Sequence, residues 1–186
     1  MEITEKEKGA LLLAARESIK NLFDQTPLPQ IDYLQYPFLK LHLGAFVTLK
    51  LERALRGCIG YILTRATLYD TVCEAAKQSA FSDPRFFPLT MEEFEKIKIE
   101  ISILSSPQKI KEYDEIIIGK HGLILDEGYI RAVLLPQVAV ANSYLREQFL
   151  SALCEKGGLF TDTWKIQKLN LQVFTATIIS EDEKYE

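Results

Sequence analysis

Hydrophobic and polar residues alternate along the chain with two different periods. From Thr4 to Phe23, apolar residues recur at helical spacing, and Thr4 with Glu7 matches a helix capping box, so we expect an amphipathic helix. In residues 97–103, isoleucines alternate with polar residues, which predicts a strand with one buried and one solvent-facing side. Such a strand is typical of an antiparallel sheet.

Between these two elements the pattern predicts a β-hairpin and a second helix. The segments "GAFVTLK" and "LRGCIGYIL" are rich in branched and aromatic residues and are separated by "LERA". Residues 67–81 then combine a threonine cap with apolar positions at helical spacing, which favours a helix packed on the hairpin. "SDPRFFPLT" reads as a rigid connector, and Thr90 with Glu93 forms a second capping box at the start of a short helix.

The second half of the chain repeats the order of hairpin, helix and strand. We expect a hairpin over residues 122–136 with its turn at 126–128, a helix over 143–158 ended by glycines, and one final strand over 169–179. Strands and helices interleaved in this way indicate an α+β fold with two similar hairpin–helix–strand repeats. We expect one domain over residues 1–186, with a possible division into residues 41–104 and residues 1–40 plus 105–186.

Composition narrows the class of protein. With 47% hydrophobic residues, a net charge of −4 and no long apolar run, the chain is expected to be cytoplasmic, with neither membrane nor nucleic acid as a partner. Three cysteines, an odd number, fit a reducing compartment. The two histidines lie near no cysteine, and no phosphate-loop or dinucleotide-binding glycine pattern is present, so we expect no metal site and no cofactor.

The segment "LRGCIG" carries the most unusual chemistry. In an extended strand, Arg56, Cys58 and Gly60 share one face, and a guanidinium near a thiol would favour the reactive thiolate. Gly57 and Gly60 weaken a strand and are usually kept for a bulge or for close approach, which would open a ligand groove over it. The alternative is a packed cysteine and an arginine that pairs with a carboxylate at the strand edge.

Other candidates come from three separate segments. His121, between two glycines, could act as a general base or could only satisfy its turn. Asp83 and Arg85 flank a proline in "SDPRF", where the arginine could hold a carboxylate or phosphate, or could simply be solvated beside an aspartate turn. Gln137 follows a strand end and could contact a ligand or satisfy the backbone.

The ordered motifs "LRGCIGYI", "FSDPRFFPL", "IIIGKHGLIL" and "VLLPQVA" resemble those of the AMMECR protein family, and the resemblance spans nearly the whole chain. It implies an α+β fold with a barrel-like antiparallel sheet and flanking helices. It also implies a microbial member of the AmmeMemoRadiSam-type system, with a Memo-like protein and a radical SAM enzyme as partners.

Three functions remain open at this point. The leading hypothesis is an accessory protein that binds a small molecule or a partner at the LRGCIG strand, through Arg56, Gly57, Gly60, Asp83, Arg85 and Gln137. The alternative is an enzyme with Cys58 as an arginine-activated nucleophile and His121 as a possible base. A nucleic-acid-linked regulator is a third, which the acidic net charge disfavours.

Overall fold

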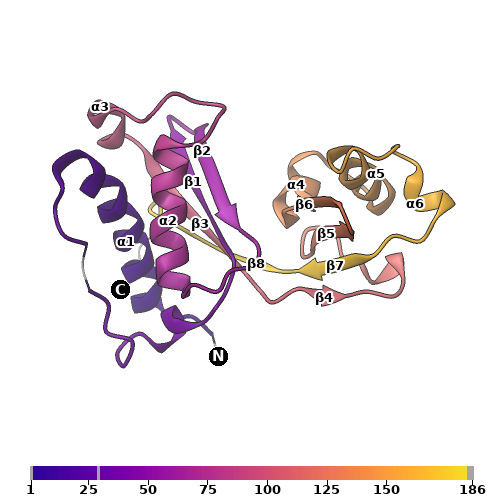
Figure 1. Cartoon of the computed structure of the whole chain (residues 1–186), viewed down its shortest axis with the longest axis horizontal. Coiled ribbons are helices and arrows are strands. Elements are labelled where there is room, and N and C mark those ends of the chain that lie inside the picture. The colour runs from indigo at the N-terminus through magenta and orange to yellow at the C-terminus, as the bar shows by residue number, and fades with distance from the viewer. Residues whose placement is uncertain (1, 29, 184–186) are drawn as a thin grey trace. The chain divides into compact units, whose positions relative to one another are not determined.

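The computed structural model describes residues 2–28 and 30–183 (Figure 1). Contacts divide the chain into two compact units, which we call unit 1 (residues 1–104 and 177–186) and unit 2 (residues 105–176). No helix in the described ranges is long and apolar enough to cross a membrane.

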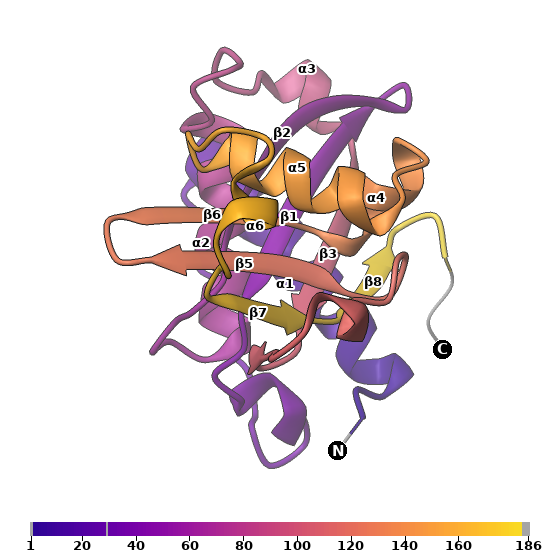
Figure 2. The ribbon, with the colours of Figure 1, turned by 90° about the vertical axis from the view of Figure 1, so that its right-hand side faces the viewer.

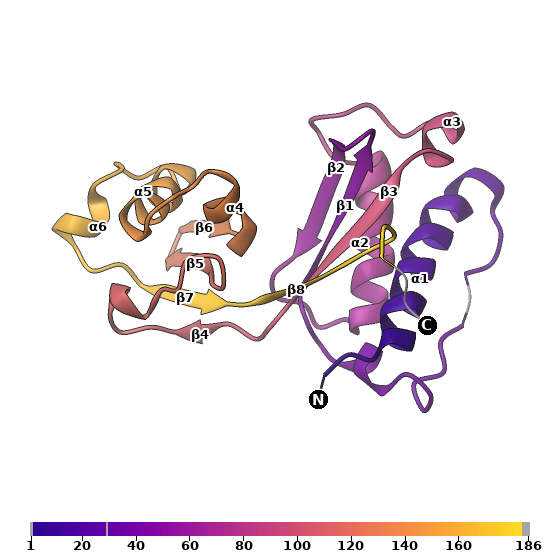
Figure 3. The ribbon, with the colours of Figure 1, turned by 180° about the vertical axis from the view of Figure 1, so that it is seen from behind.

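Unit 1 is a four-stranded sheet covered on one face by two long helices (Figures 1 and 3). Thr4 caps the first helix with the expected capping box, and Thr67 caps the second. The inward isoleucines of the third strand, with residues of both helices, form the main hydrophobic core. The elements of unit 1 are α1 (Glu5–Asp24), η1 (Pro37–Lys40), β1 (Ala45–Leu51), β2 (Ala54–Tyr61), α2 (Leu68–Phe81), α3 (Met91–Phe94), β3 (Lys98–Leu104) and β8 (Ala176–Ser180).

Unit 2 has its own four-stranded sheet and its own core, in which Phe149 and Leu153 are fully buried. Figure 2 shows β6, β5 and β7 of this sheet side by side. The elements of unit 2 are β4 (Gln108–Lys109), η2 (Tyr113–Glu115), β5 (Gly122–Glu127), β6 (Ile130–Leu134), α4 (Pro136–Ala141), α5 (Arg146–Lys156), α6 (Thr163–Ile166) and β7 (Leu171–Phe174).

Strand order supports the similarity between the two halves and corrects the expected barrel. The sheets run β2-β1-β3-β8 and β4-β7-β5-β6, so in each unit the first hairpin strand lies between its partner and the returning strand. The hairpin and return pairings are antiparallel in both units. Within the described residues both sheets are open, because each has two edge strands and neither closes on itself.

Three details differ from the sequence prediction. The expected strand over residues 169–179 is two strands, β7 and β8, in different sheets, because Thr175 breaks the ladder and pairs its backbone with Ser105. The turn of the second hairpin lies after Glu127, at Gly128 with its positive φ of 68°. The helix α1 belongs with residues 41–104 rather than with the second half, because it packs against α2.

Candidate functional site

The LRGCIG strand is the edge strand β2, and its residue Arg56 lies in a β-bulge. Leu49 pairs with Gly57 but Lys50 pairs with Leu55, which leaves Arg56 as the extra residue. A bulge re-aims its side chain. The Arg56 guanidinium donates to both carboxylate oxygens of Glu93, at 2.8 and 2.9 Å, and to the Phe87 carbonyl at 3.0 Å. Arg56 is therefore anchored to the connector and to α3.

Cys58 is held at the sheet edge by the DPRF segment. Its N–H donates to Asp83 Oδ2 at 2.8 Å, and its carbonyl accepts from Arg85 Nη2 at 3.1 Å. Arg85 also donates to both oxygens of Asp83, at 2.9 and 2.6 Å. The buried Asp83 carboxylate and the Arg85 guanidinium thus hydrogen-bond to the N–H and the carbonyl of Cys58. An edge strand would otherwise leave these two backbone groups unpaired. We call the side chains of Arg56, Asp83, Arg85 and Glu93 the edge clamp.

Both carboxylates of the edge clamp are stabilised in their charged form. The hydrogen bond from Arg85 holds the pKa of Asp83 well below its usual range, against the opposing effect of burial. The hydrogen bond from Arg56, followed by the backbone N–H of Thr90, lowers the pKa of Glu93 to about 2. The clamp is therefore fully ionised at neutral pH.

The arginine that binds Cys58 is Arg85, through the Cys58 carbonyl, whereas the Arg56 guanidinium is bound to Glu93. The pKa of Arg85 is raised mainly by Asp83, with smaller contributions from the half-buried Cys58 thiol. The Thr48 hydroxyl, across the ladder on β1, donates to the Cys58 sulfur at 3.4 Å. Cys58 therefore has one hydroxyl and one guanidinium as neighbours.

The glycines of the strand make room for neighbouring parts of the protein. A Cβ at Gly57 would lie 2.1 Å from the Ser79 carbonyl oxygen, so α2 approaches the strand directly. The Ser79 hydroxyl accepts from the Ile59 N–H and donates to the Val47 carbonyl, each at 2.8 Å. At Gly60, the space is filled by the neighbouring strand β1, because an added Cβ would lie 2.4 Å from both the Ala45 carbonyl oxygen and the Phe46 Cγ.

The edge clamp also holds two consecutive aromatic residues of the connector. Phe86 is half-buried, with the guanidinium carbons of Arg56 and Arg85 at 5.8 and 5.5 Å from its ring centroid. Phe87 follows it with 90% of its surface exposed, although its carbonyl is held by Arg56. The connector thus presents a large apolar side chain from a backbone that is tied to the sheet.

His121 and Gln137 belong to unit 2. His121 Nδ1 accepts from the Ile117 N–H at 3.3 Å and closes a turn that contains Gly119 at a φ of 80°. Burial, followed by the charge of Lys120, lowers the pKa of His121, so the imidazole is neutral at pH 7. Gln137 is half-buried in the first turn of α4. Neither side chain shares a unit with Cys58.

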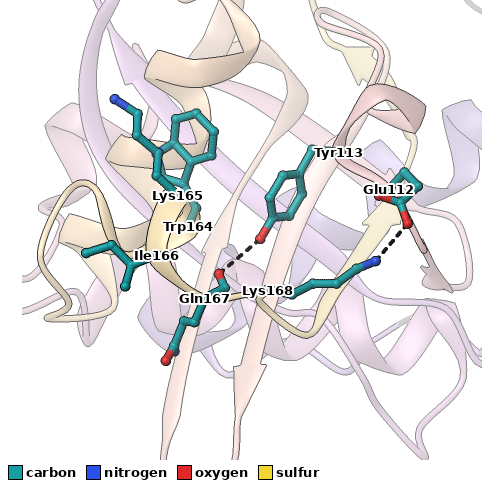
Figure 4. Close-up of a pocket in the computed structure, with 7 residues that line it drawn as sticks. All are labelled: Glu112, Tyr113, Trp164, Lys165, Ile166, Gln167 and Lys168. Carbon is teal, nitrogen blue, oxygen red and sulfur yellow. Dashed lines mark hydrogen bonds and ion pairs between the residues drawn. The ribbon is translucent and has the colours of Figure 1, made fainter.

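A pocket of unit 2 was not predicted from the sequence (Figure 4). Tyr113 and Trp164 stand edge to face with their ring centroids 6.0 Å apart, and they line both this pocket of about 220 Å³ and a second hollow of about 600 Å³. The indole N–H donates to the Ser151 hydroxyl at 3.0 Å. The single tryptophan of the chain was the available signal, but its partner Tyr113 is distant in sequence.

The described residues contain no cluster of three or more histidine, cysteine or acidic side chains arranged to hold a metal ion. The fold and the edge clamp define a mixed α+β protein with two open antiparallel sheets, in which the two sequence motifs meet at one edge strand. The chain belongs to the AMMECR1 family, whose sequence model matches residues 12–179.

Relatives and a solved structure agree with this assignment. A protein of Aquifex aeolicus is 36% identical over 182 residues, covering 94% of this chain and 93% of that protein. The protein MJ0810 of Methanocaldococcus jannaschii is 41% identical over 148 residues, covering 75% of this chain and 74% of that protein. The crystal structure of the uncharacterized protein PH0010 from Pyrococcus horikoshii matches with a TM-score of 0.88 and 32% identity, covering 98% of this chain and 95% of that one.

Proposed function

We propose that this protein is an accessory protein that binds a protein partner through the connector between α2 and α3, with Phe87 as the anchor of the interface. The observation that carries the proposal is that Phe87 is 90% exposed while its carbonyl is held by Arg56. Exposed aromatic residues on a preorganised backbone are typical interface hot spots, because little conformational entropy is lost on binding. The family resemblance nominates a Memo-like protein and a radical SAM enzyme as partners.

The arginines beside the anchor support a protein partner. Arg85 is about half exposed, with its side chain at 53% of full accessibility, and it already pairs with Asp83. Arginine and aromatic residues are enriched in interface cores. A partner that covers Phe87 would also cover Arg85, so its contact surface should carry a carboxylate or carbonyl close to an apolar pocket.

The test is a titration against the Memo-like protein and the radical SAM enzyme encoded in the same genome, by isothermal calorimetry. Phe87→Ala should weaken binding by roughly tenfold or more, as expected for an anchor residue. Phe160→Ala is the matched control, since Phe160 is also 90% exposed but lies in unit 2. Equal affinity of the two variants, or no saturable binding to either protein, would contradict the proposal.

A second candidate is an enzyme with Cys58 as its nucleophile. It is favoured by the surroundings of Cys58, whose sulfur accepts from the Thr48 hydroxyl and whose carbonyl accepts from the Arg85 guanidinium. His121 has no demonstrated part in this scheme, because its Nδ1 is engaged by its own turn.

Thiol labelling decides between these candidates with internal controls. Cys73 and Cys154 are buried, and burial raises the pKa of each, so iodoacetamide should modify Cys58 first. A nucleophile should label along a titration curve well below the ordinary thiol pKa of about 8.5, and Arg85→Gln should move the curve upward. A curve at the ordinary value that Arg85→Gln leaves in place would remove the enzyme hypothesis.

A further inference from the structure

A pocket of about 500 Å³ lies in unit 1, and its lining residues come from the tip of the β1–β2 hairpin, the segment around the start of β3 and the segment after β8. Figure 3 shows the strands β1, β2, β3 and β8 of unit 1. Its volume lies in the usual range for small-molecule sites. Four of its six lining residues are cationic in a protein whose net charge is −4. The lining residues are Lys50, Glu52, Arg53, Lys96, Lys98 and Asp182.

The cations of the pocket are only partly neutralised. Lys50 pairs with Glu100 at 2.7 Å, and Lys96 pairs with Glu92 at 2.6 Å on the open surface. Lys98 lies directly opposite Lys50 in the β1–β3 register, where like charges repel. Within the described ranges, Lys98 and Arg53 have no ion pair of their own. Two positive charges therefore line the pocket without an ion pair among the described residues, beside the carboxylates of Glu52 and Asp182.

The conformation of the β1–β2 turn also indicates that the side chains of Glu52 and Arg53 bind a ligand. Glu52 and Arg53 occupy the two turn positions with φ values of 50° and 71°. Such a turn favours asparagine and glycine, because a side chain is disfavoured in the left-handed region. The chain nevertheless places an acid and an arginine there. Strained positions of this kind are commonly found at ligand-binding sites.

The lining residues together define the ligand chemistry. Arg53 and Lys98 supply charge-assisted donors for a phosphate or another compact anion. Glu52 and Asp182 supply acceptors at the same pocket, which suit hydroxyl groups, as a carboxylate binds ribose hydroxyls in nucleotide sites. We propose that this pocket binds a small phosphate ester that also carries hydroxyl groups, of the sugar phosphate class. The proposal is independent of partner binding at Phe87.

The experiment is calorimetric titration of the full chain with ribose 5-phosphate, inorganic phosphate and ribose. We expect saturable binding of ribose 5-phosphate, weaker binding of phosphate, and none of ribose. Arg53→Asn and Lys98→Gln should each weaken the binding of ribose 5-phosphate by about tenfold, the typical effect of losing one charge-assisted contact. Asparagine suits the left-handed turn, so the first variant should fold at least as well as the parent.

Two controls accompany the titration. Lys156→Gln removes an exposed lysine at the end of α5 and should leave the affinity unchanged. A short single-stranded oligonucleotide tests nucleic acid as another source of phosphate. The proposal is overturned if ribose 5-phosphate shows no saturation below about 10 mM, a range of very weak affinity. It is equally overturned if both pocket variants bind like Lys156→Gln, or if only the oligonucleotide binds.

Discussion

The two units arrange hairpin, helix and return strand in the same order, but they treat their edge strands differently. In unit 1, the edge strand β2 has eight residues, and Asp83 and Arg85 occupy the backbone N–H and carbonyl of Cys58. In unit 2, the edge strand β6 has five residues, and its residue Arg131 pairs with Asp126 of β5 at the surface. A long edge strand exposes more unpaired backbone groups than a short one, so it needs more protection against pairing with a strand of another chain.

The need to protect the edge strand β2 explains most residues of the motifs "LRGCIG" and "DPRF". Asp83 and Arg85 of "DPRF" bind the backbone of Cys58, and Arg56 of "LRGCIG" binds Glu93 and the Phe87 carbonyl. The glycines admit α2 and Phe46. What remains for function is what the edge clamp leaves exposed, namely Phe87, part of Arg85 and the half-buried Cys58.

The largest expected effect comes from opening the edge clamp. Asp83→Ala removes a buried carboxylate and leaves the Cys58 N–H and the Arg85 guanidinium without their acceptor. We expect a loss of about 3 kcal/mol in the free energy of opening unit 1. Each unit carries one buried cysteine, Cys73 in unit 1 and Cys154 in unit 2. Thiol labelling at fixed pH, read by peptide mass spectrometry, therefore reports each unit separately.

The matched control is Asp126→Ala in unit 2. Asp126 also pairs with an arginine, but the Arg131 side chain is 76% exposed, so the change should cost no more than about 0.5 kcal/mol. Asp83→Ala should accelerate the labelling of Cys73 roughly 100-fold and leave Cys154 unchanged. Similar small effects of the two variants would show that the clamp does not stabilise the edge.

The second prediction compares a glycine from each sheet. At Gly57 an added Cβ meets the backbone oxygen of Ser79, and at Gly122 it meets the far end of the Phe174 ring, 2.3 Å away. A helix backbone yields less easily than a side chain. Gly57→Ala should therefore cost about 2 kcal/mol and Gly122→Ala about 1 kcal/mol.

The same labelling experiment measures both glycine variants, through Cys73 for Gly57→Ala and through Cys154 for Gly122→Ala. The reverse order would mean that the core around Phe174 is the more rigid of the two, and that α2 can move away from β2.

Local elements were predictable because their signals are local. The capping boxes at Thr4 and Thr90 and the alternating isoleucines of β3 each depend on residues a few positions apart, and the structure confirms all three elements. The family was predictable from its motifs, and the match over residues 12–179 confirms it.

Partners of side chains were not predictable in the same way. Glu93 was recognised only as a capping residue, but one carboxylate both caps α3 and binds Arg56. The bulge at Arg56 depends on the pairing with β1, which strand alternation alone cannot reveal. The split of the final strand likewise depends on the pairing of Thr175 with Ser105.

The smallest predicted effect is a difference in how acid affects the two units. Because the folded pKa of Glu93 is about 2, below the ordinary value of 4.5, its contribution is complete above pH 4.5 and is lost as the pH falls toward 2. After allowance for solvent screening, we expect about 1 kcal/mol from this group. In unit 2, His121 affects stability at a higher pH than Glu93 does. Because the folded state lowers the pKa of His121, the free energy of unfolding decreases once the pH falls below the unfolded pKa of about 6.5.

Urea unfolding at a series of pH values separates the two contributions. Trp164, the single tryptophan, lies in unit 2, so its fluorescence follows that unit while far-UV circular dichroism follows both. Glu93→Gln should destabilise the protein at pH 7, and its difference from the parent should disappear near pH 2, with the fluorescence transition unmoved. If fluorescence and circular dichroism shift together, the units unfold as one cooperative body, and the edge clamp then contributes to the stability of both.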